Sequence, residues 1–335
     1  MNVLVVRLDS FGDVLLAGPA VRAAAARAAH LTVLCGPLGE PAARMLPGVD
    51  DVIVWRAPWE GVHPPDVEEA DVPGLVAELR ERAFDTALVL TSFHQSPLPA
   101  ALLLRLAGVG RIGADSVDHP GRLLDVRHRR LPDRHEAEAA LDTALAMGFR
   151  LRAGDDGRLR VLPAPDTAAL TGNGPYVVVH PGASAPARSW DAERHAEAVR
   201  MLADAGHRVV VTGGPAEKAL TRMVSGDDAV DLGGRTGPRE LAGVLRGADA
   251  LVSANTGPAH LAAAVGTPVV SLFAPVVPAS RWAPYGVPTV LLGDQRADCA
   301  GTRARHCPVP GHPCLNGVTA HDVVSAVHKL LKESA

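Results

Sequence analysis

Aromatic residues are scarce in this sequence of 335 residues, where phenylalanine, tryptophan and tyrosine together make up 3%. A protein that stacks the bases of single-stranded nucleic acid on aromatic side chains is therefore not indicated. The sequence also lacks a large excess of charge of one sign, because the net charge at pH 7 is only −4. Without a basic excess the sequence offers no obvious surface for nucleic acid. We expect no nucleic-acid partner.

Long apolar runs are absent as well. No run reaches the ~18 residues that a membrane-spanning helix needs. The N-terminus passes directly into a strand-like pattern and lacks the basic region and cleavage site of a signal peptide. We therefore predict a cytoplasmic protein, with at most peripheral contact at the inner face of the membrane.

Four cysteines are too few for a disulfide framework in a chain of this length. Three of the cysteines and two histidines could supply enough ligands for one metal site: Cys299, Cys307, Cys314, His306 and His312. The gaps of seven and six residues between these cysteines fit no standard zinc spacing. We favour a structural role for free thiols over a bound metal.

Apolar strand-like runs alternate with helical patterns along the whole chain, which predicts parallel sheets covered by helices on both faces. The length favours two domains, at roughly 100–200 residues each. Strands are expected at 2–8, 31–35, 51–55, 86–91, 176–180, 207–213, 250–254 and 268–273. Helices are expected at 14–29, 72–83, 96–107, 135–148, 190–205, 215–224, 238–247, 257–265 and 319–332.

Residues 161–175 are rich in proline, glycine and threonine and have weak periodicity, which is typical of a linker. The predicted α/β organisation is an N-terminal domain at 1–160, this linker, a C-terminal domain at 176–318 and a final helix within 319–335. One option for that helix is to pack back on the first domain. We expect these two doubly wound domains to face each other across a cleft. Ligands in such sheets bind at the carboxyl ends of the strands.

A polar turn follows the first strand, in the stretch "RLDSFGDV". Asp13 is either a first-turn helix carboxylate, worth about 1 kcal/mol, or a proton acceptor at a ligand site. Asp9 could cap the helix equally well, so one of the two carboxylates is not needed for capping. Arg7, Ser10 and Gly12 belong to the same turn and are candidates for the acceptor side of a site.

A second polar loop, "HPGASAPARSW", lies between a strand and a helix. Gly182 and Ser184 allow close approach of a ligand to the backbone, and free N–H groups suit phosphate. Arg188 adds a guanidinium that matches phosphate oxygens. The alternative is an ordinary loop with an arginine that faces solvent. The cluster of small residues with a cation favours a phosphate site.

Another glycine loop, "VTGGPAEKA", comes one strand later. Gly213 and Gly214 again permit close backbone approach. Glu217 follows in the first helical turn. It either binds ribose hydroxyls or only complements the helix dipole, and the sequence leaves both open.

The stretch "SANTGPAHLAAAVGTPVVSLF" begins where a strand ends. Asn255, Thr256 and Gly257 open a helix whose first-turn N–H groups would favour a diphosphate. His260 in that turn is either structural or part of the site.

Other nucleotide and hydrolase motifs are excluded. The G-x-G-x-x-G match at 108–113 follows a helix and leads into a short strand, which is the wrong context for a dinucleotide fingerprint. The sequence has no D-x-D at a strand end for a metal-bridged diphosphate, no P-loop and no G-x-S-x-G elbow.

In their order and spacing these stretches resemble the bacterial heptosyltransferase family (glycosyltransferase family 9), inverting enzymes with the GT-B fold. "RWAPYG" at 281–286 and the cysteine-rich "CPVPGHPCL" add to the resemblance, which covers nearly the whole chain. It implies a nucleotide-diphosphate sugar as co-substrate, with ADP-heptose favoured, and no cofactor or metal. Family members act in lipopolysaccharide core biosynthesis, but a glycan, lipid-linked or small-molecule acceptor all remain open.

The resemblance also implies roles for single residues. Asp13 matches the general base, Arg188 matches a position where relatives usually carry lysine for the donor phosphates, and Glu217 matches the ribose-binding acid. The donor-binding helix start is matched by Thr256, Gly257 and His260. Asn255 stands where relatives most often have aspartate, which leaves the donor sugar open.

Two other functions remain as alternatives. One is a non-transferring GT-B enzyme such as a nucleotide-sugar epimerase, which would need further acid–base groups. The other is a non-catalytic nucleotide-sugar-binding protein, which would not need Asp13.

Overall fold

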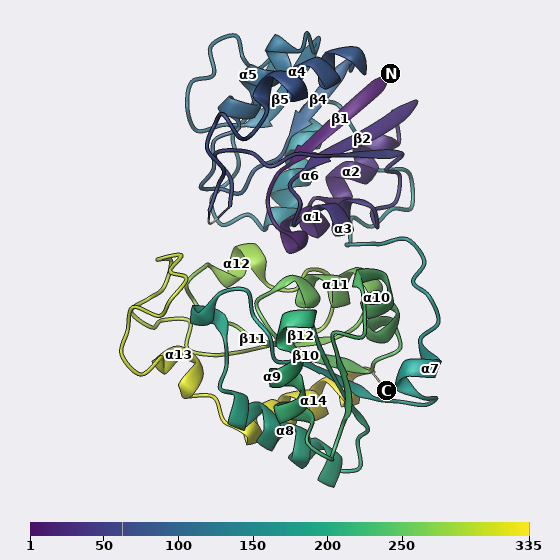
Figure 1. The fold of residues 1–335 in the computed structure, drawn as a ribbon, viewed down its shortest axis with the longest axis vertical. Coiled ribbons are helices and arrows are strands. Elements are labelled where there is room, and N and C mark those ends of the chain that lie inside the picture. Colours follow the sequence, from purple (N-terminus) through teal and green to yellow (C-terminus); the bar gives the residue numbers. More distant parts are fainter. Residues whose placement is uncertain (62, 335) are drawn as a thin grey trace. The chain divides into compact units, whose positions relative to one another are not determined.

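The structure is a computed structural model that describes residues 1–61 and 63–334. It divides into two compact units, with the boundary between Leu162 and Pro163 (Figure 1). Each unit is built around a six-stranded sheet of parallel strands. The fold class predicted from the alternating pattern is therefore confirmed.

The first unit has the strand order β3-β2-β1-β4-β5-β6. The order reverses beside β1, which pairs with β2 on one side and with β4 on the other. Its strands are β1 (Asn2–Arg7), β2 (His30–Cys35), β3 (Asp51–Val54), β4 (Thr86–Val89), β5 (Arg111–Asp115) and β6 (Val126–His128). Its helices are α1 (Phe11–Leu16), α2 (Gly18–Ala25), α3 (Glu40–Ala43), α4 (Val72–Glu81), α5 (Leu98–Leu106) and α6 (Glu136–Ala146).

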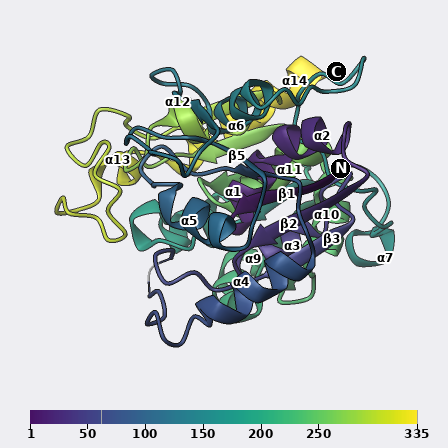
Figure 2. The same cartoon turned by 90° about the horizontal axis from the view of Figure 1, so that it is seen from above.

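Helices cover both faces of this first sheet, with α2 and α6 on one side and α4 and α5 on the other (Figure 2). Strands buried on both faces need continuous apolar runs, and β1 supplies one in Val3 to Val6. Leu4 and Val6 pack into the core beneath α4 and α5, together with Leu75 and Leu104.

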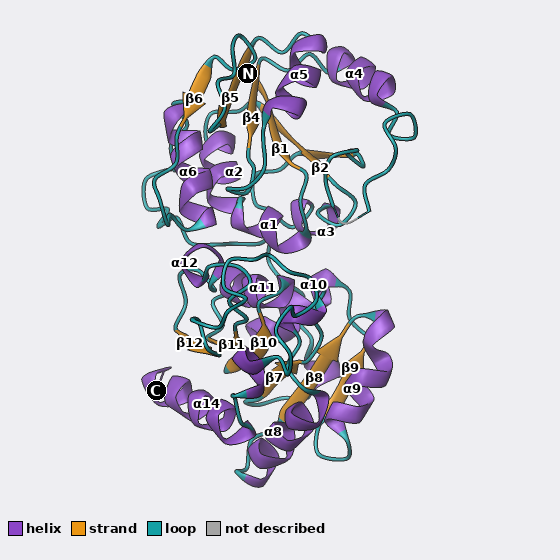
Figure 3. Ribbon diagram, turned by 90° about the vertical axis from the view of Figure 1, so that its left-hand side faces the viewer, coloured by secondary structure: helices purple, strands orange, loops and turns teal. Residues whose placement is uncertain are grey.

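The second unit repeats the plan, with the order β12-β11-β10-β7-β8-β9 and a reversal between β7 and β10. Its strands are β7 (Val177–His180), β8 (Val209–Gly213), β9 (Val230–Gly233), β10 (Ala250–Ala254), β11 (Val269–Leu272) and β12 (Thr289–Leu292). Its helices are α7 (Ala168–Thr171), η1 (Pro186–Arg188), α8 (Ala192–Asp204), η2 (Pro215–Glu217), α9 (Lys218–Ser225), α10 (Pro238–Arg246), α11 (Gly257–Val265), α12 (Ala279–Trp282), α13 (Pro313–Asn316) and α14 (Ala320–Ser334). Figure 3 shows α8 and α14 on one side of this sheet, with α10 and α11 on the other.

The C-terminal helix α14 packs within the second unit. Its apolar residues Val323, Val327 and Leu330 are buried in the core of the second unit, and the helix contacts α8 and strands β10 to β12. Burying this apolar stripe against its own sheet stabilises the helix, since isolated helices of this length are marginal.

Most of the predicted linker at 161–175 lies in the second unit. There Thr167 precedes the short helix α7, and the carbonyl of Pro165 packs closely over Gly243 of α10. The proline and glycine content of this segment did not predict the packing, because composition indicates turns but not tertiary contacts.

The helix expected at 14–29 is split into α1 and α2 at Ala17. Gly18 and Pro19 open α2, and a proline without an N–H starts a helical segment more readily than it continues one. Strands β6, β9 and β12, which the sequence did not predict, are short and mostly polar or only partly buried edge strands. The G-x-G-x-x-G match at 108–113 was predicted to follow a helix and lead into a short strand. This is confirmed, since the stretch links α5 to β5.

Among residues 1–61 and 63–334, none of the helices has the length and apolar character needed to span a membrane.

Candidate functional site

A buried polar cluster lies at the carboxyl ends of β1 and β4, where the strand order of the first sheet reverses. Arg7 is 2% exposed, and its Nη2 donates a hydrogen bond to Ser92 Oγ at 2.8 Å. The same nitrogen is 3.2 Å from Asp9 Oδ2 and 3.5 Å from Asp13 Oδ1. Ser92 Oγ donates in turn to Asp9 Oδ2 at 2.9 Å. One guanidinium therefore faces two carboxylates at the edge where such sheets bind ligands.

Asp13 lies in the first turn of α1, as the sequence predicts. Ser10 is the residue before the helix, but its hydroxyl donates to Asp13 Oδ2 at 2.7 Å and does not cap the backbone. The Asp13 side chain is 21% exposed, against 8% for Asp9. Gly12 is buried within the helix. Asp13 is therefore the carboxylate of this turn that a substrate reaches more easily.

Burial raises the pKa of Asp9 to about 7. The charge of Arg7 opposes this rise, the charges of Asp13 and Glu60 add to it, and the hydrogen bond from Ser92 lowers the pKa. Asp9 therefore titrates near neutral pH, far above an ordinary carboxyl group.

Three members of this cluster were not predicted from the sequence. The backbone N–H of Ser92 donates to Gln95 Oε1 at 2.7 Å, and Gln95 Nε2 donates to Glu60 Oε2 at 2.7 Å. These residues follow β4 and β3, and no local motif marks them. Only the strand order brings them beside β1.

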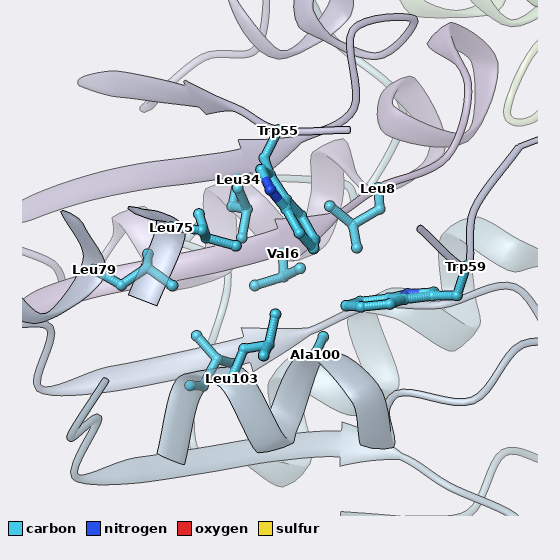
Figure 4. A pocket seen from close by; sticks show the side chains of 10 residues that line it. Val6, Leu8, Leu34, Trp55, Trp59, Leu75, Leu79, Ala100 and Leu103 are labelled. Atoms are coloured by element: carbon cyan, nitrogen blue, oxygen red, sulfur yellow. The ribbon is translucent and has the colours of Figure 1, made fainter. Parts of the chain in front are cut away.

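An apolar pocket lies on the face of the first sheet that α4 and α5 cover. It is lined by Val6, Leu8, Trp55, Trp59 and residues of these two helices (Figure 4). Its cavity volume of about 10 Å³ is at the lower limit for one water molecule. We interpret it as imperfect core packing and place the candidate site at the polar cluster.

In the second unit, the reversal between β7 and β10 also gathers predicted residues. Arg188 Nη1 donates a hydrogen bond to the backbone carbonyl of Asn255 at 3.3 Å. This bond joins the loop after β7 to the end of β10. The side chain of Asn255 is almost fully buried, and its Nδ2 has no hydrogen-bond partner in the described part of the chain. The guanidinium of Arg188 and the buried residue Asn255 therefore lie together at one strand end.

Helix α11 begins at this point. Thr256 precedes it in an extended conformation, and its side chain does not cap the helix. Gly257 and Pro258 form the first turn, and His260 is buried in it. The helix start adds N–H donors and the positive end of the dipole, which suit an anion.

The side chain of Glu217 turns back toward Gly214, the residue that precedes η2. Its Oε2 accepts the N–H of Gly214 at 2.6 Å and lies 3.9 Å from His180 Nε2. Burial lowers the pKa of His180, and Glu217 opposes that shift. The carboxylate lies over Gly182 so closely that a Cβ there would be 1.9 Å from Oε1, and Gly213 is packed against the same side chain. Two of the predicted glycines therefore make room for Glu217.

This packing gives a testable prediction. Replacing Gly182 with alanine should displace Glu217 and lower the free energy of unfolding by about 1–3 kcal/mol, the usual cost of overpacking. Urea denaturation of Gly182→Ala, Glu217→Ala and the double variant measures the effect. Because Glu217→Ala removes the clashing atoms, we expect the double variant to be clearly more stable than the sum of the single changes. Additive changes would contradict the proposed contact.

The cysteine-rich segment near the C-terminus supports the loop that carries Arg188. Arg305 Nη2 donates to the carbonyl of Ser184 at 3.1 Å, and the N–H of Ala187 donates to the carbonyl of Arg305 at 2.8 Å. His312 Nε2 is 3.0 Å from the carbonyl oxygen of Ala187. The sequence considered His312 only as a metal ligand, and its backbone partner lies 125 residues away.

All four cysteines are free thiols, and Cys299 and Cys314 are buried. Burial raises the pKa of Cys314 to about 12, and the neighbouring Cys299 adds to the shift. Thiols with such a pKa stay protonated near neutral pH. In the described ranges, 1–61 and 63–334, no three histidine, cysteine or acidic side chains are grouped as a metal site.

Most of the chain matches a known protein family. Residues 74–312 match the model of glycosyltransferase family 9 (heptosyltransferase). The chain is 30% identical over 166 residues to lipopolysaccharide heptosyltransferase 3 of Escherichia coli K12, a match that covers 48% of this chain and 47% of that protein. The chain thus spans about half the length of the curated relatives it matches.

Solved structures share the fold over nearly the whole chain. ADP-heptose lps heptosyltransferase II of E. coli has a TM-score of 0.74 and 20% identity, with 100% of both chains covered. A glycosyltransferase family 9 protein from Veillonella parvula has a TM-score of 0.79 and 17% identity, covering 99% of this chain and 97% of that one. E. coli heptosyltransferase WaaC with ADP-2-deoxy-2-fluoro heptose has a TM-score of 0.71 and 23% identity, with 100% of both covered. The two units therefore form a GT-B fold.

Proposed function

This chain belongs to glycosyltransferase family 9, the heptosyltransferase family, and we propose that it moves a heptose from ADP-heptose to an acceptor hydroxyl. The observation that carries the proposal is the meeting of Arg188, Asn255 and the start of α11 at one strand end. A similar protein, E. coli WaaC, has been solved with an ADP-heptose analogue, which supports a donor of the same class here.

The donor diphosphate would bind where cationic and N–H groups converge in the second unit. Arg188 supplies a permanent positive charge, and α11 supplies backbone N–H groups. The buried amide of Asn255 offers a further donor to a ligand. Glu217 remains a proposed partner for the ribose hydroxyls, which would add to its hydrogen bond with Gly214.

We assign the general base to Asp13 of the first unit. The acceptor hydroxyl passes its proton to the Asp13 carboxylate while its oxygen bonds to the anomeric carbon of the donor. The bond from that carbon to the phosphate oxygen breaks in the same displacement, and the diphosphate leaves with the electron pair. A single displacement inverts the anomeric centre, so one base is sufficient.

Negative charge grows on the departing diphosphate during this step. Arg188 and the N–H groups at the start of α11 are fixed donors that can stabilise it, which is the role a metal ion has in other sugar transferases. We therefore propose a metal-independent reaction without a cofactor. The residues at the end of β1, including Arg7 and Ser10, would contact the acceptor side.

The acceptor we favour is a lipopolysaccharide core, because two curated relatives are named lipopolysaccharide heptosyltransferases. A glycan, lipid-linked or small-molecule acceptor would present the same hydroxyl chemistry. The epimerase alternative loses support from the family match, and the binding-protein alternative does not explain the polar cluster around Asp13.

A donor panel tests the proposal. ADP-heptose at 100 times its dissociation constant should stabilise the protein by roughly 2.7 kcal/mol, since it binds only the folded state. For a domain of this size that raises the melting temperature by roughly 5–10 °C. Thermal unfolding with ADP-, GDP- and UDP-sugars measures the preference, and mass spectrometry of a heptose-free lipopolysaccharide core measures transfer. Stabilisation by a UDP-sugar alone would refute the donor assignment.

A further inference from the structure

The cluster at the end of β1 contains one more carboxylate than a single displacement requires. Asp9 and Asp13 both approach the same Arg7 nitrogen, at 3.2 and 3.5 Å. Asp9 is held there by a second contact, the hydrogen bond that it accepts from Ser92 at 2.9 Å. Ser92 also accepts from Arg7, so these three residues form a closed unit beside Asp13.

We propose that Asp9 is a positioning residue for the transfer reaction, which shares the Arg7 guanidinium and so keeps Asp13 basic enough to accept the proton of the acceptor hydroxyl. The inference rests on the proposed role of Asp13. It gives Asp9 no contact with substrate, because the Asp9 side chain is the more deeply buried of the two, at 8% exposed against 21%.

The charge balance around Arg7 explains the effect. A guanidinium stays protonated in proteins, so Arg7 is a permanent cation inside the unit. Paired with Arg7 alone, Asp13 would bind a proton poorly and would be a weak base. A second carboxylate on the same nitrogen changes the net charge of the group from zero to −1. The added negative charge raises the proton affinity of Asp13.

Other charges face this group from neighbouring elements. Glu60, in the loop after β3, acts on both Asp9 and Arg7, and Glu136 of α6 acts on Arg7. Glu136 also pairs with Arg130, at 2.9 Å between Nη1 and Oε1, so part of its charge is already neutralised. Both glutamates act in the same direction as Asp9, but only Asp9 contacts the Arg7 nitrogen that faces Asp13.

The arrangement responds to pH. The pKa of Asp9 lies at about 7 because the carboxyl is buried. Above that pH Asp9 is charged and Asp13 is the stronger base. As the pH falls through 7, Asp9 takes up a proton and Arg7 is left to Asp13 alone. Transfer should therefore slow on acidification near pH 7, well above the range in which an ordinary carboxyl titrates.

The test compares the pH dependence of kcat in wild type and Asp9→Asn, with ADP-heptose and a heptose-free lipopolysaccharide core as substrates and ADP release as the readout. Asparagine still accepts the Ser92 hydrogen bond but carries no charge. We expect kcat of Asp9→Asn to be roughly threefold to tenfold below wild type at about pH 8.5 and equal to it at about pH 5.5. KM for the donor should not change.

Two further variants separate this role from a structural one. Ser92→Ala removes the hydrogen bond that lowers the pKa of Asp9, so the acidic limb of the profile should move to higher pH. It also serves if Asp9→Asn does not fold. Asp155→Asn is the matched control, because Asp155 pairs with Arg22 in the same unit at 2.7 Å but has no contact with Arg7. Its profile should keep the shape and midpoint of wild type.

The possible outcomes are distinct. Profiles of Asp9→Asn and Ser92→Ala that run parallel to wild type would overturn the role of Asp9. Full activity of Asp13→Asn would instead refute the proposed base, and no ADP release from wild type would refute the proposed substrates. Loss of the acidic limb near pH 7 in Asp9→Asn, with normal donor KM, supports the inference.

Discussion

Replacing Asp13 with alanine is expected to lower kcat for sugar transfer by roughly 10²- to 10⁴-fold, with the dissociation constant for ADP-heptose unchanged. The acceptor hydroxyl is a poor nucleophile until its proton is removed, and general bases contribute effects of about this size. Asp13 belongs to the first unit, whereas the proposed donor groups belong to the second. The base and the donor site should therefore respond separately to mutation.

Steady-state kinetics and isothermal titration calorimetry measure the two quantities. Asp13→Asn preserves the size of the side chain and a partner for Ser10, so a similar loss in that variant would assign the effect to the charge. Asp155→Asn again serves as the control for a carboxylate in the same unit. Unchanged turnover in Asp13→Ala would remove this residue from the mechanism.

The second large effect is expected at Arg188. Replacing it with alanine should lower kcat/KM by roughly 10²- to 10³-fold, because a fixed donor to the leaving diphosphate is lost. Unlike the change at Asp13, this one should also weaken binding of ADP itself, since in the proposed site the guanidinium contacts the phosphates before and after transfer.

Arg188→Lys is the informative companion. It keeps the charge but loses the planar fork, and so should recover only part of the activity. Because Arg188 also donates to the carbonyl of Asn255 at 3.3 Å, thermal unfolding of each variant is needed to exclude a loss of fold. A variant Arg188→Ala that binds ADP as tightly as wild type would place the diphosphate elsewhere.

The predictions that succeeded from sequence depend on local patterns. Apolar runs of three or four residues marked β1, β7 and β10, because strands buried on both faces of a sheet need continuous apolar side chains. Short edge strands such as β6 carry no such run and were missed. The helix starts at α4, α10 and α11 were also readable, since proline and glycine restrict where a helix begins.

The site divides in the same way. The residues of the first turn, Asp9 to Asp13, are neighbours in sequence, so their type and spacing already predicted a charged strand end. Their partners were not predictable. Ser92 lies 85 residues from Arg7 and 83 from Asp9, and it reaches them only because β4 pairs with β1.

Sequence alone therefore determined that this is a two-domain α/β protein with polar loops after particular strands, since residue periodicity and turn chemistry are local properties. The tertiary structure decided which carboxylate is buried and which is open, that Glu217 turns toward Gly214, and that Arg188 meets Asn255. These outcomes depend on strand order, which brings distant segments together. Burial and charge then set the partners and the pKa of each group.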